Sequence, residues 1–120
     1  MKALFDTNVL IDYLRGLPAA RAELERYDDK AVSIVSWMEV FAGASPAVER
    51  ATRDFLDSFA LIELDHAVAD RAVALRRQRR IKLPDAIVWA SAQVHAMLLV
   101  TRDTRGFPED DPGVRMPYTV

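Results

Sequence analysis

The chain has 120 residues, 51% of them hydrophobic, which suits one globular domain spanning residues 1–120. It contains no cysteine, and this excludes disulfide bonds, zinc–thiolate sites and cysteine nucleophiles. The formal net charge of −2 excludes a uniformly basic nucleic-acid-binding protein, so attraction to a polyanion must come from a local patch or a bound metal.

Strands and helices are expected to alternate along the chain. In chain order, the pattern predicts a strand at 2–5, helices at 9–14 and 19–27, a strand at 31–35, helices at 36–42 and 46–59, a strand at 61–64, helices at 66–78 and 86–96, a strand at 97–101 and an edge strand at 116–120. The helix at 86–96 is apolar almost all round, so we expect it to be central and buried. The segment 106–117, rich in Pro, Asp and Glu, is expected to be the least ordered. This alternation predicts an α/β fold in which helices surround a parallel sheet.

The chain does not open with a charged stretch followed by a long apolar one, so we expect no signal peptide. The longest apolar stretches, such as residues 96–100, are far too short to span a membrane. We therefore expect a cytoplasmic protein with no membrane partner.

Four of the 18 acidic residues occupy related positions: Asp6, Glu39, Asp85 and Asp103. Each has an ordinary structural explanation, because Asp6 and Asp85 fall at expected helix N-caps, Ser36 to Glu39 matches a capping box, and Asp103 lies in a turn. Their joint placement is more informative. Asp6 and Asp103 directly follow predicted strands, and Glu39 and Asp85 lie in the first turns of predicted helices. In a parallel sheet these positions share one edge, where functional sites form.

Four carboxylates at one edge would repel one another, and a divalent cation would offset this repulsion more than helix N-termini can. Oxygen ligands without His or Cys favour Mg²⁺ or Mn²⁺ over zinc. Such ions activate water and stabilise the charge that develops on a phosphate. The pattern therefore favours phosphodiester hydrolysis.

Four sequence blocks resemble the PIN-domain family, and most of all the VapC toxins of bacterial type II toxin–antitoxin pairs. The blocks are LFDTNVLI at 4–11, SIVSWMEVFAG at 33–43, KLPDAIVWA at 82–90 and LVTRDTRGF at 99–107. The resemblance covers residues 3–107. It implies an α/β/α sandwich around a short central parallel sheet and an Mg²⁺-dependent endoribonuclease, with Mn²⁺ as a substitute ion.

Carried over residue by residue, the resemblance makes Asp6, Glu39, Asp85 and Asp103 a catalytic acidic quartet. It implies that Asp6, Asp85 and Asp103 bind metal, with Asp6 and Asp103 nearest to the first ion. It also implies supporting hydrogen bonds from Thr7, Asn8 and Thr101. Many family members carry an Asp where this chain has Gly106, so this protein must manage without that carboxylate as an extra ligand.

The resemblance further implies an RNA substrate, a homodimer and a cognate VapB-type antitoxin that inserts a segment near the acidic pocket in a larger toxin–antitoxin assembly. A basic run without acids precedes Asp85 and provides candidate RNA-binding residues, namely Arg76, Arg77, Arg79, Arg80 and Lys82. The same run also suits a solvated helix face or a contact with an antitoxin.

Two other functions compete with this interpretation. A phosphotransfer or dehalogenase-like enzyme would use Asp6 as a nucleophile, but it would want a second acid at residue 8, where this chain has Asn8. A non-catalytic RNA- or protein-binding PIN-like module would use the acids only as helix caps. His66 and His95 lack the spacing of metal ligands, so we expect both to be structural.

Overall fold

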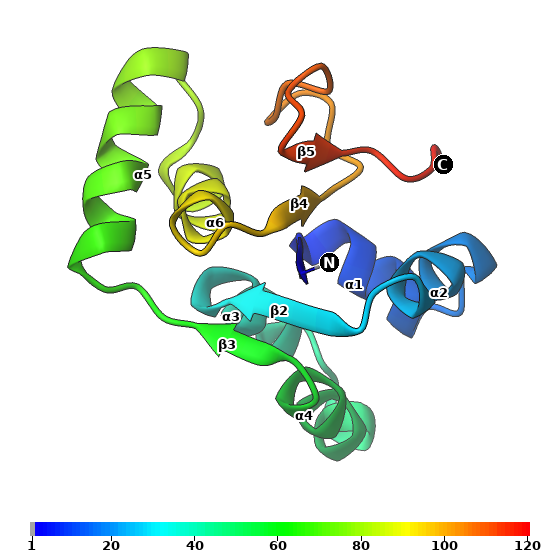
Figure 1. Ribbon diagram of the computed structural model, residues 1–120. Helices are drawn as coiled ribbons and strands as arrows, with labels where there is room; N and C mark the ends of the chain where they lie inside the picture. The colour runs from blue at the N-terminus through cyan, green and yellow to red at the C-terminus, as the bar shows by residue number, and fades with distance from the viewer. Residues whose placement is uncertain (1) are drawn as a thin grey trace.

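The computed structural model describes residues 2–120, which form a five-stranded sheet with helices on both faces (Figure 1). The strands are β1 (Lys2–Phe5), β2 (Asp29–Ser33), β3 (Ala60–Ile62), β4 (Leu98–Val100) and β5 (Val114–Arg115). The helices are α1 (Thr7–Leu14), α2 (Pro18–Glu25), α3 (Ile34–Ala42), the 3-10 helix η1 (Pro46–Val48), α4 (Glu49–Asp57), α5 (His66–Arg79) and α6 (Leu83–Val94). The predicted α/β class with a parallel sheet is confirmed.

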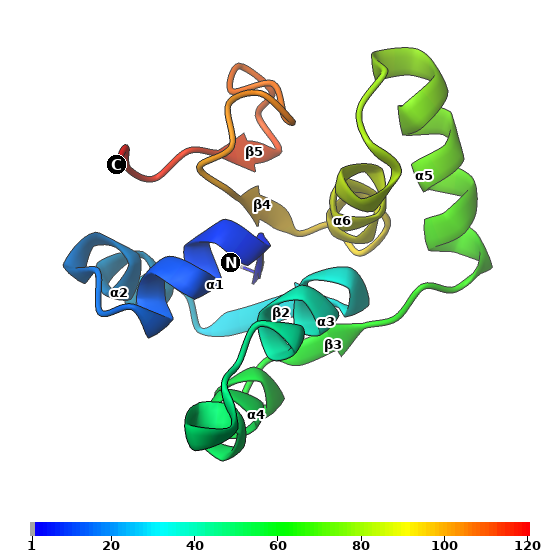
Figure 2. The same ribbon diagram turned by 180° about the vertical axis from the view of Figure 1, so that it is seen from behind.

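The sheet has the strand order β3-β2-β1-β4-β5, and every neighbouring pair is parallel. In register, Leu4 of β1 lies opposite Ala31 of β2 on one side and Leu99 of β4 on the other. The chain therefore leaves β1 toward β2 in one direction and reaches β4 in the other. Such a switch point leaves a crevice at the carboxyl ends of the strands. Figure 2 shows α1 and α3, which follow β1 and β2, on the near side of the molecule.

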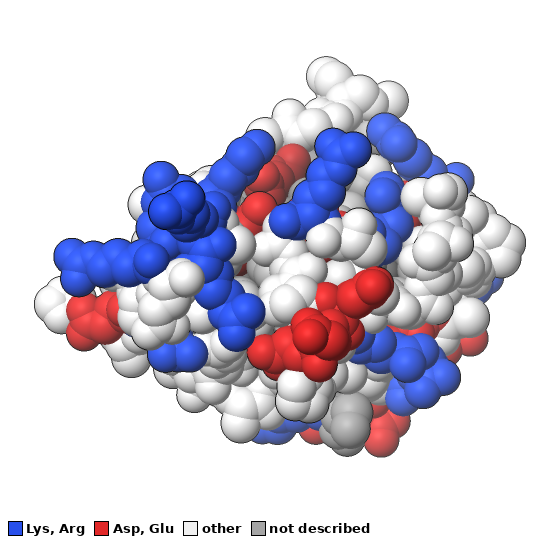
Figure 3. Space-filling view, turned by 90° about the horizontal axis from the view of Figure 1, so that it is seen from above, with Lys and Arg blue, Asp and Glu red and all other residues white. Residues whose placement is uncertain are grey.

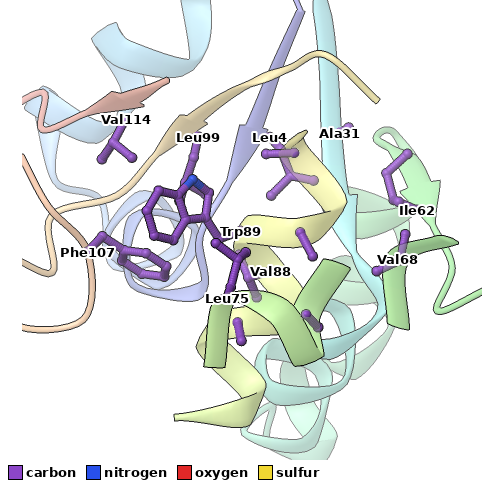
Figure 4. Close-up of a cluster of buried hydrophobic side chains, with 14 residues drawn as sticks. Leu4, Ala31, Ile62, Val68, Leu75, Val88, Trp89, Leu99, Phe107 and Val114 are labelled. Atoms are coloured by element: carbon purple, nitrogen blue, oxygen red, sulfur yellow. The ribbon is translucent and has the colours of Figure 1, made fainter. Parts of the chain in front are cut away.

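Two hydrophobic cores cover the two faces of the sheet. On the face of α5 and α6, Trp89 is 1% exposed and meets Phe107 edge to face, with 6.0 Å between ring centroids (Figure 4). Phe107 therefore fastens the loop after β4 against α6. The expectation that the predicted helix at 86–96 is central is confirmed, because six of the 12 residues of α6 are buried, all of them between Ala86 and Ala92. On the opposite face, Phe5 packs edge-on against Tyr27 and Phe59.

The predicted starts of the two helices that carry Glu39 and Asp85 are wrong, and the correction affects both acids. Helix α3 begins at Ile34, and its N-cap is Ser33, whose hydroxyl accepts a hydrogen bond from the Val35 N–H at 3.0 Å. Glu39 therefore does not belong to a capping box. Helix α6 has Lys82 at its N-cap position, so Asp85 lies inside the first turn instead of capping it. Neither acid is needed as a cap.

The C-terminal segment also differs from its prediction. The edge strand expected at 116–120 lies earlier, at β5, where it pairs with β4. The segment 106–117 is held to the domain, because Arg115 forms a two-point ion pair with Glu23 of α2 at 2.7 and 3.0 Å. No helix within residues 2–120 is both long enough and apolar enough to cross a membrane.

Candidate active site

Asp6 lies at the junction of β1 and α1, and it is 6% exposed. One carboxylate oxygen accepts the Thr7 N–H at 2.8 Å, as an N-cap does, and the other accepts the Thr101 hydroxyl at 2.8 Å. Burial raises the pKa of Asp6 to about 6, although the bonds from Thr101 and Thr7 lower it. Repulsion by Asp85 and Asp103 adds to the increase. The cap prediction for Asp6 is confirmed, and its charge interacts with two other acids.

Thr101 connects the end of β4 to Asp6. It is fully buried, and its hydroxyl oxygen also accepts the backbone N–H of Asp103 at 3.1 Å. The Asn8 amide donates to Asp6 Oδ2 at 3.4 Å and lies 3.5 Å from the Thr101 hydroxyl oxygen. Thr101 therefore links Asp6 to the Asp103 backbone, and Asn8 contacts both Asp6 and Thr101.

Glu39 reaches the site from α3 through Thr7. The Thr7 hydroxyl donates to Glu39 Oε1 at 2.7 Å and lies 2.9 Å from the hydroxyl oxygen of Ser36. Ser36 is fully buried within the first turn of α3. The sequence suggested no role for it here, because the capping-box pattern assigned it to the start of its own helix. Thr7 follows Asp6 directly, so this contact brings the start of α3 next to the start of α1.

Asp85 and Asp103 converge over Gly106. Asp103 Oδ1 accepts the backbone N–H groups of Arg105 and Gly106 at 3.0 and 3.1 Å. A Cβ atom on Gly106 would lie 2.6 Å from Asp103 Oδ2 and 3.1 Å from Asp85 Oδ2. Glycine at this position therefore leaves room for the two carboxylates, and a larger residue there would press against the Asp103 carboxylate first. The sequence marked Gly106 only as a departure from the family pattern.

The charges of the quartet act on one another. The pKa of Asp85 is raised, first by burial and then by repulsion from Asp103 and Glu39, while Lys82 opposes the shift. The charges of Asp85 and Asp103 also repel the ionised form of Asp6. The structure therefore brings all four predicted acids into one group whose charges interact. A group of this kind is stabilised by a cation.

The donor set suits a hydrated Mg²⁺ or Mn²⁺ ion. Within residues 2–120, no three acidic side chains stand close enough to enclose a cation by themselves. Mg²⁺ usually keeps several water ligands and binds proteins through one or two carboxylates. Asp6, Asp85 and Asp103 could hold such an ion, because they provide only oxygen donors at the edge of the sheet.

Basic residues line a cavity of about 350 Å³ that opens beside Asp85, Asp103 and Gly106. Its other lining residues are Arg79, Arg80, Ile81, Lys82 and Arg105. We call Arg79, Arg80, Lys82 and Arg105 the basic wall. Figure 3 shows Lys and Arg side chains on both sides of a recessed acidic group on the face seen from above. An anionic ligand could therefore lie against the basic wall and reach the acids.

Not all residues of the predicted basic run reach this cavity. Arg79, Arg80 and Lys82 line it, whereas Arg76 donates to the Ile81 carbonyl at 2.7 Å and holds the connection between α5 and α6. Arg77 is not among the lining residues. Arg105 was not predicted, because it lies 23 positions after Lys82 in a loop, outside the basic run.

His66 and His95 are exposed, and neither lines the cavity beside Asp85 and Asp103.

Known proteins share the fold and part of the sequence of this chain. The family model for the PIN domain matches residues 3–109, a range that contains all four acids. Ribonuclease VapC10 of Mycobacterium tuberculosis is 35% identical over 113 residues, in an alignment that covers 88% of this chain and 85% of that protein. A toxin–antitoxin complex from Klebsiella pneumoniae contains a chain with a TM-score of 0.93 and 44% identity, covering 98% of this chain and 99% of that one. FitAcB from Neisseria gonorrhoeae shares the fold at a TM-score of 0.80 and 24% identity, covering 98% and 99%.

Proposed function

This chain belongs to the PIN domain family, and from that premise we propose that it is the ribonuclease toxin of a type II toxin–antitoxin pair, dependent on Mg²⁺ or Mn²⁺. The observation that supports the metal dependence is the convergence of Asp6, Glu39, Asp85 and Asp103 at the carboxyl edge of the sheet. There the charges of Asp85 and Asp103 help to raise the pKa of Asp6, and those of Asp103 and Glu39 help to raise the pKa of Asp85. Two of these acids are free of the capping roles that would explain them otherwise.

The residues of the site have separable roles in hydrolysis. When bound, the metal supplies Lewis-acid activation of water and of the scissile phosphate. Asp6, Asp85 and Asp103 would hold it, and Thr101 orients the Asp6 carboxylate through its hydroxyl. Thr7 engages Glu39 Oε1, and no hydrogen bond from residues 2–120 engages Oε2. Glu39 Oε2 can therefore accept the proton of the attacking water.

Metal removal gives the first test. Purified chain incubated with structured RNA is expected to produce cleavage fragments with Mg²⁺ or Mn²⁺, none with excess EDTA, and fragments again once Mg²⁺ exceeds the chelator. Gel electrophoresis of labelled RNA measures this. Undiminished cleavage in EDTA would contradict the proposed metal dependence. An acyl-phosphate trapped on Asp6 would favour the phosphotransfer alternative, and RNA binding without turnover would favour a non-catalytic module.

The basic wall is proposed to bind RNA phosphates next to the scissile bond. Replacing both Lys82 and Arg105 with Gln should weaken binding of single-stranded RNA about fivefold for each lost phosphate contact at 0.1 M salt. The slope of log K against the logarithm of the salt concentration should become shallower by about 0.7 for each lost contact. Fluorescence anisotropy in EDTA measures binding without cleavage. Arg50→Gln is the control, because Arg50 is an exposed residue of α4 outside the cavity. An unchanged salt slope in the double variant would remove the basic wall from the RNA site.

The proposed partners are a VapB-type antitoxin and a second copy of the chain, joined in a larger assembly. The similarity to a toxin–antitoxin complex supports the antitoxin. A second cavity of about 260 Å³ next to Glu39 supports it too, since Ile11, Leu14, Val40 and Val48 give this cavity an apolar lining. An apolar segment seated there would lie at the entrance to the acidic group.

A further inference from the structure

A second buried polar cluster lies beside the candidate metal site, and the reaction proposed above makes no use of it. Asp12 of α1 is 6% exposed. Its two oxygens accept hydrogen bonds from Arg102, with Nε to Oδ2 at 2.6 Å and Nη2 to Oδ1 at 3.1 Å. The Tyr118 hydroxyl donates to the same Oδ2 at 2.7 Å. The cluster therefore joins α1, the loop after β4 and the C-terminal segment.

The position of Arg102 relates this cluster to the quartet. Arg102 stands between Thr101, which donates to Asp6, and Asp103. Its backbone N–H donates to Asn8 Oδ1 at 3.4 Å, and Asn8 lies one helical turn before Asp12 on α1. Two successive turns of α1 thus contact a single residue of the loop. A shift of Arg102 would move its neighbours Thr101 and Asp103 relative to Asp6, which is the N-cap of α1.

The chemistry of the cluster gives it a fixed geometry. A guanidinium that bonds both oxygens of a carboxylate sets their orientation as well as their distance. Burial acts to raise the pKa of Asp12, but the hydrogen bonds from Arg102 and Tyr118 outweigh it and leave that pKa lowered. Asp12 therefore stays ionised and paired at neutral pH, and the contact persists under the conditions of the reaction.

We propose that Asp12, Arg102 and Tyr118 form a positioning network that fixes Asp103 relative to Asp6 and thereby sets the affinity of the site for its metal. The inference rests on the proposed function, because it assumes that the quartet binds a divalent ion. The pair of Asp12 and Arg102 holds α1 and the loop after β4 together. Tyr118 adds the C-terminal segment to the same network, so this segment contributes to metal affinity without touching the metal.

The chain contains a matched control for this network. Glu23 of α2 is 4% exposed and accepts two hydrogen bonds from Arg115 and one from the Tyr27 hydroxyl, at 2.8 Å. This second cluster also joins one carboxylate, one guanidinium and one phenol, but its side chains make no hydrogen bond to the quartet within residues 2–120. The backbone carbonyl of Arg115 accepts the Thr101 N–H at 3.1 Å, and a side-chain substitution retains that bond.

The experiment compares Arg102→Gln with Arg115→Gln in the full chain without RNA. The dissociation constant for Mn²⁺ is measured from the electron paramagnetic resonance signal of the free ion, and stability is measured by thermal unfolding. Both variants should lose stability to a similar extent. Only Arg102→Gln should weaken Mn²⁺ binding, by about tenfold or more. Arg102→Lys should restore part of the affinity because it restores the charge, and Tyr118→Phe should have a smaller effect.

Equal Mn²⁺ affinity in wild type and Arg102→Gln would overturn the positioning role, as would an equal loss of affinity in Arg102→Gln and Arg115→Gln. RNA binding in EDTA should be the same for Arg102→Gln and wild type, which separates metal positioning from a general loss of the site. If the wild-type chain itself bound no Mn²⁺, the proposed metal dependence would fail first, and the network would lose the role inferred for it.

Discussion

Replacing Asp6 with asparagine is expected to lower the rate of RNA cleavage by at least about a hundredfold while leaving the fold intact. The substitution removes the negative charge that would hold the metal. It keeps the shape of the side chain and an oxygen for the Thr7 N–H, and asparagine is itself a good N-cap. Thr101 can accept a hydrogen bond from the new amide where it now donates to the carboxylate. Cleavage of labelled RNA under single-turnover conditions measures the loss.

Asp54→Asn is the matched control for this loss. Asp54 lies on α4, its side chain is 68% exposed, and its ion pair with Arg50 is 3.8 Å long, so the same chemical change there should leave cleavage within twofold of wild type. Cleavage by Asp6→Asn at a rate close to that of wild type would show that the charge of Asp6 does not contribute to the reaction.

The same substitution should stabilise the metal-free chain at pH 7 by on the order of 3 kcal/mol. The pKa of Asp6 is raised from 3.8 to about 6, so the folded state disfavours its ionised form. This penalty is absent below pH 3.8, grows as the pH rises, and is complete above about 6. Urea denaturation in EDTA at pH 5 and pH 7 measures it. Wild type should be more stable at pH 5 than at pH 7, and in Asp6→Asn most of this difference between the two pH values should disappear.

Other acids affect the pH dependence in different ranges. Burial first, and then repulsion, raises the pKa of Asp85, so this acid adds to the same trend. Asp12 and Glu23 have lowered pKa values, because arginine and tyrosine hydrogen bonds outweigh the effect of burial. Their contribution to stability is lost only as the pH falls through those lowered values, below the window of Asp6. If the metal-free wild type became less stable as the pH fell from 7 to 5, this result would contradict the raised pKa of Asp6.

The position of Asp6 could be predicted from sequence because all its determinants are local. A short apolar strand ends there, and the following Thr7 and Asn8 suit a helix start. Asp85 and Glu39 were also predicted as site residues, although the starts of their helices were misplaced. Helix α6 begins at Leu83, two residues before Asp85, and α3 begins at Ile34, five residues before Glu39. This leaves both carboxylates available for the site.

The remaining parts of the site depend on contacts that no local pattern encodes. Arg102 and Asp12 are 90 residues apart in the sequence, and their pairing follows from the placement of β4 next to β1. Arg105 and Gly106 face Asp85 because Phe107 packs on Trp89 and fixes the path of the loop. The short strand β5 was misplaced for a similar reason, since two residues carry too little periodicity to be located.

Binding of Mn²⁺ to the free chain tests most directly whether the four carboxylates form a metal site. Calorimetric titration at pH 6, in two buffers with different heats of ionisation, gives the dissociation constant and the number of protons released. The account predicts that wild type binds Mn²⁺ with release of about half a proton, because the pKa of Asp6 is about 6. Asp6→Asn should bind Mn²⁺ at least about tenfold more weakly than wild type, and its binding should not release this proton. Equal affinity and equal proton release in the two proteins would contradict the assignment of Asp6 to the metal.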